Sequence, residues 1–167
     1  MTTNEDLTNF IFIPLSDFIL QAIGERPYPM EGAYNAPSTD YVACQIVEIP
    51  IISSTDGART NSGVDGRDIV YTTYEAIIRI VGYGSNSLSK IQSICQAFRE
   101  KRMLQILRDK NIAYSTHTPA RNTSFGYTDK VEVRWETLCT LRFVQGGIDR
   151  GDDPSYIEKA GTTATYI

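Results

Sequence analysis

The sequence predicts a single α+β domain in which helices back a mainly antiparallel sheet. Residues 68–80 and 131–143 alternate apolar and polar side chains with the period of two that a half-buried strand requires. Apolar residues spaced by three and four at 7–23 and 88–107 indicate helices. A length of 167 residues fits one domain spanning 1–167. The expected order is α-β-β-α-β-β, with an extended loop and a C-terminal arm.

The N-terminal part begins with the helix 7–23, which Gly24 ends. Pro14 either kinks this helix or marks its true start, because proline suits only a first turn. Residues 25–40 contain three prolines and should run extended toward the first strand. That strand, 41–52, is rich in β-branched residues.

A glycine-rich loop separates the first strand from the first alternating segment. Residues 53–67 are almost wholly polar, contain three glycines and are too irregular for any element, so a mobile loop is expected. The strand from residue 68 then lies beside 41–52 as an open hairpin. Tyr74 falls on its apolar face, where a core anchor is expected.

A turn at 82–87 ends that strand and precedes a helix whose apolar positions include a second expected core anchor, Phe98. This helix, or a second one after a bend near Arg99, ends at Asn111. Strand, glycine turn and helix also build phosphate sites. The turn lacks the third glycine of the dinucleotide motif and the Gly-Lys-Ser/Thr of nucleotide loops, which favours a plain connection.

The C-terminal part contains the second alternating strand, 131–143, after a short strand at 112–116 and a polar turn at 119–126. Trp135 lies on its apolar face with Val131 and is the third expected core anchor. Beyond it, residues 145–167 lose the periodicity and should form an extended arm, with a short strand near 155–158. The opposite face of the long strand should meet solvent or a partner subunit, since its charged residues are Glu132, Arg134, Glu136 and Arg142.

Composition and charge exclude several classes of function. Sixteen Lys and Arg against twenty Asp and Glu give a net charge of −4, without the basic stripe that nucleic-acid backbones require. The basic residues between 99 and 110 are interpreted as a solvated helix face. The three cysteines are expected to be reduced and buried. The start of the chain lacks a basic secretory region and no apolar stretch suits a membrane span, so a soluble protein that stays where it is synthesised is expected.

Catalytic and metal-binding patterns are weak. His117 is the only histidine, so a catalytic triad or a multi-histidine metal site would depend on it, and its polar surroundings predict an exposed turn. Asp56, Asp65 and Asp68 flank the glycine-rich loop, but they lack the alternation and closing glutamate of a calcium loop. The sequence therefore predicts a protein that is not an enzyme and binds no cofactor or metal.

Two segments give the chain a resemblance to a known family. IVGYGSNSLSKIQSICQAFR joins an alternating strand to an amphipathic helix through a Tyr-Gly turn, and DKVEVRWETLCTLRF forms the second long strand. Over about residues 25–160 the chain resembles the neck or tail terminator proteins of tailed bacteriophages. The longer N-terminal lead and the glycine-rich loop depart from the commoner pattern.

The resemblance implies a structural virion protein that is assembled in the host cytoplasm. It would form a hexameric ring in the phage neck that caps the tail tube and joins the tail to the head connector. Its implied partners are other copies of itself, the tail tube protein and the head-tail connector or stopper protein, with the tail sheath as a further candidate. DNA would pass through the lumen without specific binding. Alternatives are another tail or connector subunit and a small ligand-binding domain. Subunit contacts are expected at Asp56, Arg59, Asp65, Arg67, Glu132, Arg134, Glu136 and Tyr156.

Overall fold

The computed structural model describes residues 4–30, 40–52, 59–61, 68–127, 130–149 and 157–159. In chain order the elements are α1 (Asn4–Ile23), β1 (Tyr28–Pro29), β2 (Tyr41–Glu48), β3 (Arg59–Asn61), β4 (Asp68–Tyr83), α2 (Ser87–Ala97), α3 (Lys101–Arg108), β5 (Ile112–His117), β6 (Arg121–Asn122), β7 (Phe125–Tyr127), β8 (Lys130–Glu132), β9 (Arg134–Asp149) and β10 (Ile157–Lys159). This is the α+β architecture that the sequence predicts.

Two long antiparallel strands, β4 and β9, form the centre of the sheet. They pair from Ile69↔Ile148 to Tyr83↔Arg134. Strand β2 lies antiparallel on the other side of β4, and β1 extends it in parallel. The second edge of β9 pairs with β6, β5 and β10 in turn. The predicted antiparallel pairing of strand 41–52 with the strand from residue 68 is thus confirmed by β2 and β4.

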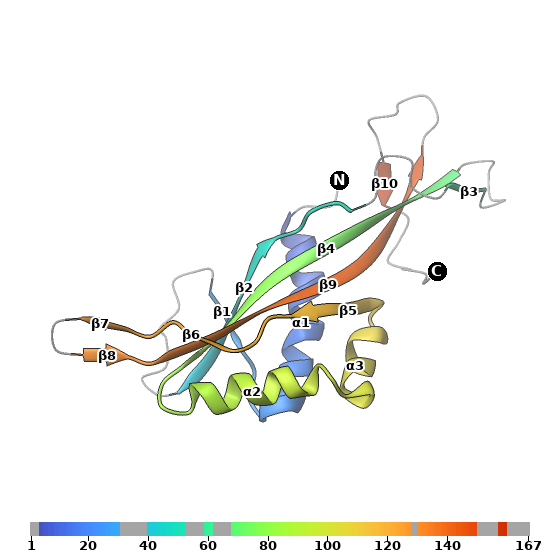
Figure 1. The fold of residues 1–167 in the computed structure, drawn as a ribbon. Coiled ribbons are helices and arrows are strands. Elements are labelled where there is room, and N and C mark those ends of the chain that lie inside the picture. The colour runs from blue at the N-terminus through green and yellow to red at the C-terminus, as the bar shows by residue number, and fades with distance from the viewer. Residues whose placement is uncertain are drawn as a thin grey trace.

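All three helices lie on one side of the sheet in Figure 1. The side chains that the strands turn toward them form the core, because alternate positions of β4, such as Ala76, Ile78 and Ile80, are fully buried. The core residues are Ile11, Leu15, Phe18, Ile19, Val42, Cys44, Ala76, Ile78, Ile80, Ile91, Ile94, Ala97, Phe98, Leu107, Ile112, Cys139, Leu141 and Phe143.

Helix α1 continues through Pro14, so the proline does not mark its start. The buried face of α1 includes Leu15 and Phe18, and Phe18 stacks on Phe98 with ring centroids 4.5 Å apart. Gly24 follows the helix at φ +78°, a conformation that glycine adopts without steric cost.

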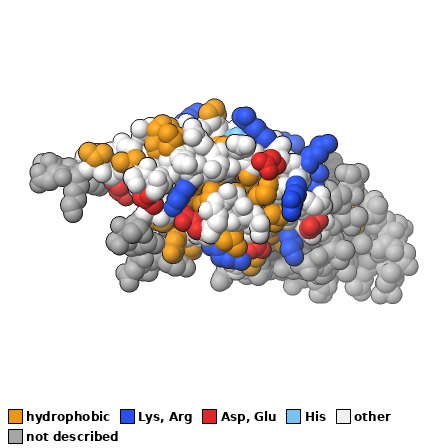
Figure 2. Space-filling view, turned by 90° about the horizontal axis from the view of Figure 1, so that it is seen from below, with side chains coloured by type: hydrophobic (Ala, Val, Ile, Leu, Met, Phe, Trp, Pro, Cys, Tyr) orange, Lys and Arg blue, Asp and Glu red, His pale blue; other side chains and the backbone are white. Residues whose placement is uncertain are grey.

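The second helical segment consists of two helices, α2 and α3, which settles the alternative near Arg99. Asn111, at φ 60°, lies between α3 and β5 in the left-handed conformation that asparagine tolerates well. The basic side chains of α3 lie on the solvated surface, as Figure 2 shows over the region of that helix.

The three expected core anchors differ in burial. Phe98 is 1% exposed and stacks on Phe18 and Tyr114. Tyr74 and Trp135 are partly buried and pack against the core from its margin. Tyr74 stacks on Phe143 with ring centroids 5.3 Å apart.

Three segments expected to be irregular contain strands. Residues 59–61 of the expected loop form β3 beside β4, and residues 121–122 of the expected turn form β6 beside β9. The expected arm begins too early, because residues 145–148 continue β9 and pair with β4. Backbone hydrogen bonds to a neighbouring strand form these elements where the side-chain pattern is weak.

The expected strand 131–143 is interrupted at Val133. Strands β7 and β8 form a separate two-stranded sheet that projects from one end of the main sheet (Figure 1). Val131 is consequently 73% exposed, and its expected place on the buried face with Trp135 is wrong. The alternation continues through this point, so the pattern alone did not show where the chain leaves the main sheet.

Candidate functional site

The face of the sheet opposite the helices carries a row of aromatic and charged side chains. Tyr41, Tyr83 and Arg134 occupy directly opposed positions on β2, β4 and β9. The rings of Tyr41 and Tyr83 stack at 4.5 Å, and Tyr28 meets Tyr41 edge-on at 5.9 Å. Burial raises the pKa of Tyr41 and of Tyr83, so both phenols are neutral at physiological pH.

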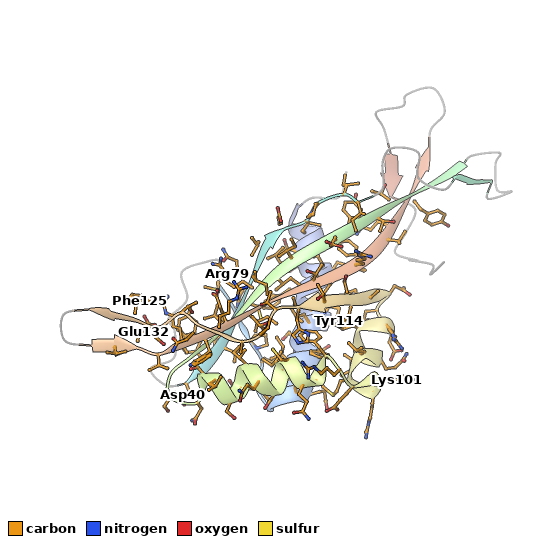
Figure 3. The ribbon with its side chains drawn as sticks, in the orientation of Figure 1. Asp40, Arg79, Lys101, Tyr114, Phe125 and Glu132 are labelled. Carbon is orange, nitrogen blue, oxygen red and sulfur yellow. The ribbon has the colours of Figure 1, made fainter. Side chains whose placement is uncertain are left out.

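Arg134 connects this row to the β7–β8 hairpin. Its guanidinium carbon lies 5.0 Å from the ring centroid of Tyr83 and 4.2 Å from that of Phe125, both in cation–π range. Its Nη2 donates to Glu132 Oε2 at 2.6 Å. Figure 3 shows Phe125 and Glu132 side by side at the base of the hairpin.

Two further Arg–Glu pairs lie along the same face. Arg142 Nε donates to Glu75 Oε2 at 2.7 Å across β9 and β4, and Arg79 Nε lies 3.8 Å from Glu136 Oε2. Within the described part of the chain, the Nε atoms of Arg79 and Arg134 are buried without a hydrogen-bond acceptor. The face therefore presents charges of both signs, while these two Nε atoms are covered by the chain's own atoms.

The glycine turn before α2 is occupied from within the chain. Asp40 Oδ1 accepts from Ser85 N at 2.8 Å, and Asp40 Oδ2 accepts from Asn86 N at 3.1 Å (Figure 3). A Cβ on Gly84 would lie 1.8 Å from Asp40 Oδ1. The amides that a bound phosphate would need are thus already paired with a carboxylate, which supports the plain connection expected from sequence.

These hydrogen bonds affect the ionisation of Asp40. Burial would raise the pKa of its carboxyl group, but donors from Asn86 and Ser85 together outweigh burial and hold that pKa below its ordinary value. Lys90 Nζ bonds both the Asp40 carbonyl and Glu25 Oε1, at 3.0 and 2.6 Å. Asp40 thereby ties the start of β2 to the start of α2.

A groove of about 940 Å³ separates α2 from β5 on the helix side, lined among others by Cys95, Tyr114 and Trp135. His117 also lines it, so the expectation of an exposed turn is wrong: His117 ends β5, half-buried, with Nδ1 2.5 Å from Tyr114 Oη. Burial and then the Arg99 charge lower its pKa. Its ring stacks on Phe98 at 5.6 Å, which gives it a packing role.

Two further features of the described residues bear on reactivity and metal binding: the buried thiols and the arrangement of possible metal ligands. Cys44 and Cys139 are buried, and burial raises the pKa of Cys139 to about 12, so its thiol stays protonated. Across the described ranges, no group of acidic, histidine or cysteine side chains is arranged to hold a metal ion. The helices in those ranges are all too short or too polar to cross a membrane.

Of the expected contact residues, Glu132, Arg134 and Glu136 lie together on the charged side of the sheet. Arg59 belongs to β3, whose side chains lie outside the described set. The other expected contacts also lie outside the described residues: Asp56, Asp65, Arg67 and Tyr156.

Sequence reasoning missed the residues that join distant segments. Asp40 is 45 residues from Ser85, and nothing in its surroundings indicated a hydrogen-bonding partner. Tyr41 and Tyr83 were detectable as the ends of two strands predicted to pair as a hairpin. Arg79, Glu75 and Arg142 followed the polar alternation, which identified their face but not their partners.

Comparison with known proteins identifies the family of this chain. No curated protein matches the sequence. The family model described as phage neck terminator protein matches residues 11–167, nearly the whole chain. This chain therefore belongs to the phage neck terminator protein family.

Proposed function

We propose that copies of this chain assemble into a closed ring, a hexamer by its resemblance to tail terminators, that caps the tail tube and joins the tail to the head connector. The observation that carries the proposal is the helix-free face of the β4–β9 sheet. Its Arg–Glu pairs present charges of both signs side by side, a pattern that suits contact with another chain.

Ion pairs on this face do little for the stability of one subunit. The Arg142 and Glu75 side chains are 54% and 23% exposed, and exposed pairs typically contribute about 0–1 kcal/mol. Charges of both signs instead fix the register of a neighbour and disfavour wrong partners. We assign Glu132, Arg134 and Glu136 to such contacts, and extend the same proposal to Asp56, Arg59, Asp65, Arg67 and Tyr156.

The ring is tested by native mass spectrometry of the purified protein, alone and mixed with tail tubes, and by negative-stain imaging of tube ends. We expect a closed homo-oligomer that seats on one end of the tube and stops further growth. A protein that stays monomeric both alone and with tubes would contradict the ring.

The lumen of such a ring should let DNA slide without holding it. A net charge of −4 is consistent with a neutral or acidic channel. Filter binding with duplex DNA should therefore give weak retention at physiological salt. Tight retention that falls steeply with added salt would overturn this part of the proposal.

A further inference from the structure

The β7–β8 hairpin exposes an apolar surface that the subunit itself does not use. Val131 is 73% exposed and Val133 is 37% exposed. Val131 lies in β8, which projects from the main sheet in Figure 1, and Val133 connects β8 to β9. Two-stranded hairpins without a packed face are marginally stable in water. Gly126, Val131 and Val133 are together termed the donor face.

Contacts and backbone conformation within the described subunit do not explain why position 126 is a glycine. It sits in β7 opposite Val131, and a Cβ built there would meet nothing within 4 Å among the atoms of this chain. Its φ lies outside the positive range that demands glycine. Glycine weakens a strand, and in such a place it often marks close approach of another backbone.

A second apolar surface lies beside the middle of β4, away from the hairpin. Val47, Ile51 and Ile52, termed the acceptor edge, are 48%, 61% and 48% exposed. Ile51 pairs with Tyr74, and β1 covers the outer edge of β2 only at residues 43–44. Within the described ranges, that edge therefore offers unpaired backbone groups beside exposed aliphatic side chains.

The two surfaces differ in shape and are well separated. Along β4, Tyr74 beside the acceptor edge and Tyr83 at the hairpin base are nine residues apart, about 30 Å at roughly 3.4 Å per residue. Unlike patches this far apart cannot contact each other within one molecule, but they can join identical molecules head to tail, and such contacts form a ring where the rotation between copies closes.

We infer that the donor face of one copy packs on the acceptor edge of the next copy, with Gly126 allowing the two backbones to approach. This inference rests on the proposed ring and names its contact. The occupant is a second copy because both halves of the contact are exposed among the described residues of the same subunit.

The first test is Gly126→Thr, which restores a good strand former in open space. It should leave the melting temperature of the subunit unchanged or raise it, and should abolish the ring. The matched control, Ser115→Thr, adds a methyl group at an exposed position of β5 outside both surfaces and should assemble normally. If Gly126→Thr forms rings that bind tubes as the wild-type protein does, the proposed contact is wrong but the proposed ring is supported. Rings that form but fail to bind tubes would assign the hairpin to the tube instead.

The second test does not require ring closure. In a Cys95→Ser background, differently tagged Val131→Cys and Ile51→Cys subunits are mixed and treated with a short bis-maleimide. We expect a cross-linked pair carrying both tags, and none when Ser115→Cys replaces Ile51→Cys. If the product with both tags is absent, the proposed contact is wrong, whether or not the wild-type protein forms rings. If that product forms but the wild-type protein never forms a closed ring, the contact is supported and the proposed ring is wrong.

Discussion

Replacing Arg134 with methionine should loosen the base of the β7–β8 hairpin without unfolding the main sheet. The change removes cation–π contacts to Phe125 and Tyr83, at 4.2 and 5.0 Å, each worth about 0.5–1 kcal/mol when partly exposed. It also removes the ion pair with Glu132, about 0.2–1 kcal/mol because both side chains meet solvent. The expected loss of local stability is therefore about 1–3 kcal/mol.

Hydrogen exchange measures this loss directly, because amides in β7 and β8 exchange through local opening. At 1.4 kcal/mol per factor of ten, exchange in the hairpin should rise about 5- to 150-fold. Amides in the middle of β4 and β9 should keep their wild-type rates, because their hydrogen bonds do not involve the Arg134 side chain.

Two variants control the measurement. Arg142→Met removes one exposed ion pair with Glu75 and should change local exchange by less than about fivefold. Arg134→Lys keeps the charge but loses the planar group that stacks on Phe125, so its effect should be intermediate. Unchanged hairpin exchange in Arg134→Met, or an equal rise across the whole sheet, would refute the assigned role.

Three further predictions concern stability. Gly84→Ala should destabilise the fold more than Gly24→Ala, since both have positive φ but only Gly84 lies against Asp40; equal unfolding free energies in urea would contradict the contact. Asp40→Asn should lower the melting temperature at pH 7, because the donors from Ser85 and Asn86 stabilise the ionised Asp40 carboxylate in the folded state. The difference from wild type should shrink as the pH falls below about 3.8 and Asp40 becomes protonated. A difference that does not change between pH 7 and pH 3 would count against this. Phe98→Ala should cost about 3–5 kcal/mol and Trp135→Ala, only partly buried, no more than about 3 kcal/mol; the reverse order in thermal melts would show that the core is wrongly assigned.

The sheet and its core were predictable because a period of two is a local property of the chain. Ile78 and Ile80 on β4, and Cys139 and Leu141 on β9, follow the alternation and are fully buried. The family resemblance arose from the same segments. The alternation of apolar and polar residues therefore predicted which face of β4 and of β9 packs against the helices.

Features that depend on partners distant in sequence were not predictable. The polar segment with Arg59 forms a strand only because β4 offers it a backbone partner. Asp40 reaches Ser85 and Asn86 only after β2 and β4 have paired. Val131 lies outside the main sheet because the pairing of β9 with β4 ends at Arg134. A local sequence pattern does not show where such pairing ends.

The charged face combines low intrinsic stability with a capacity to bind. Leaving a buried donor such as Arg79 Nε or Arg134 Nε unpaired costs about 1–3 kcal/mol each, and the exposed ion pairs nearby offset little of that. Because both Nε atoms are covered by the subunit's own atoms, a neighbouring chain could supply an acceptor to them only if the two arginine side chains changed conformation on assembly. Such a change would return part of this cost as binding free energy. In the proposed ring, contact with the correct neighbour would then stabilise both the interface and the subunit.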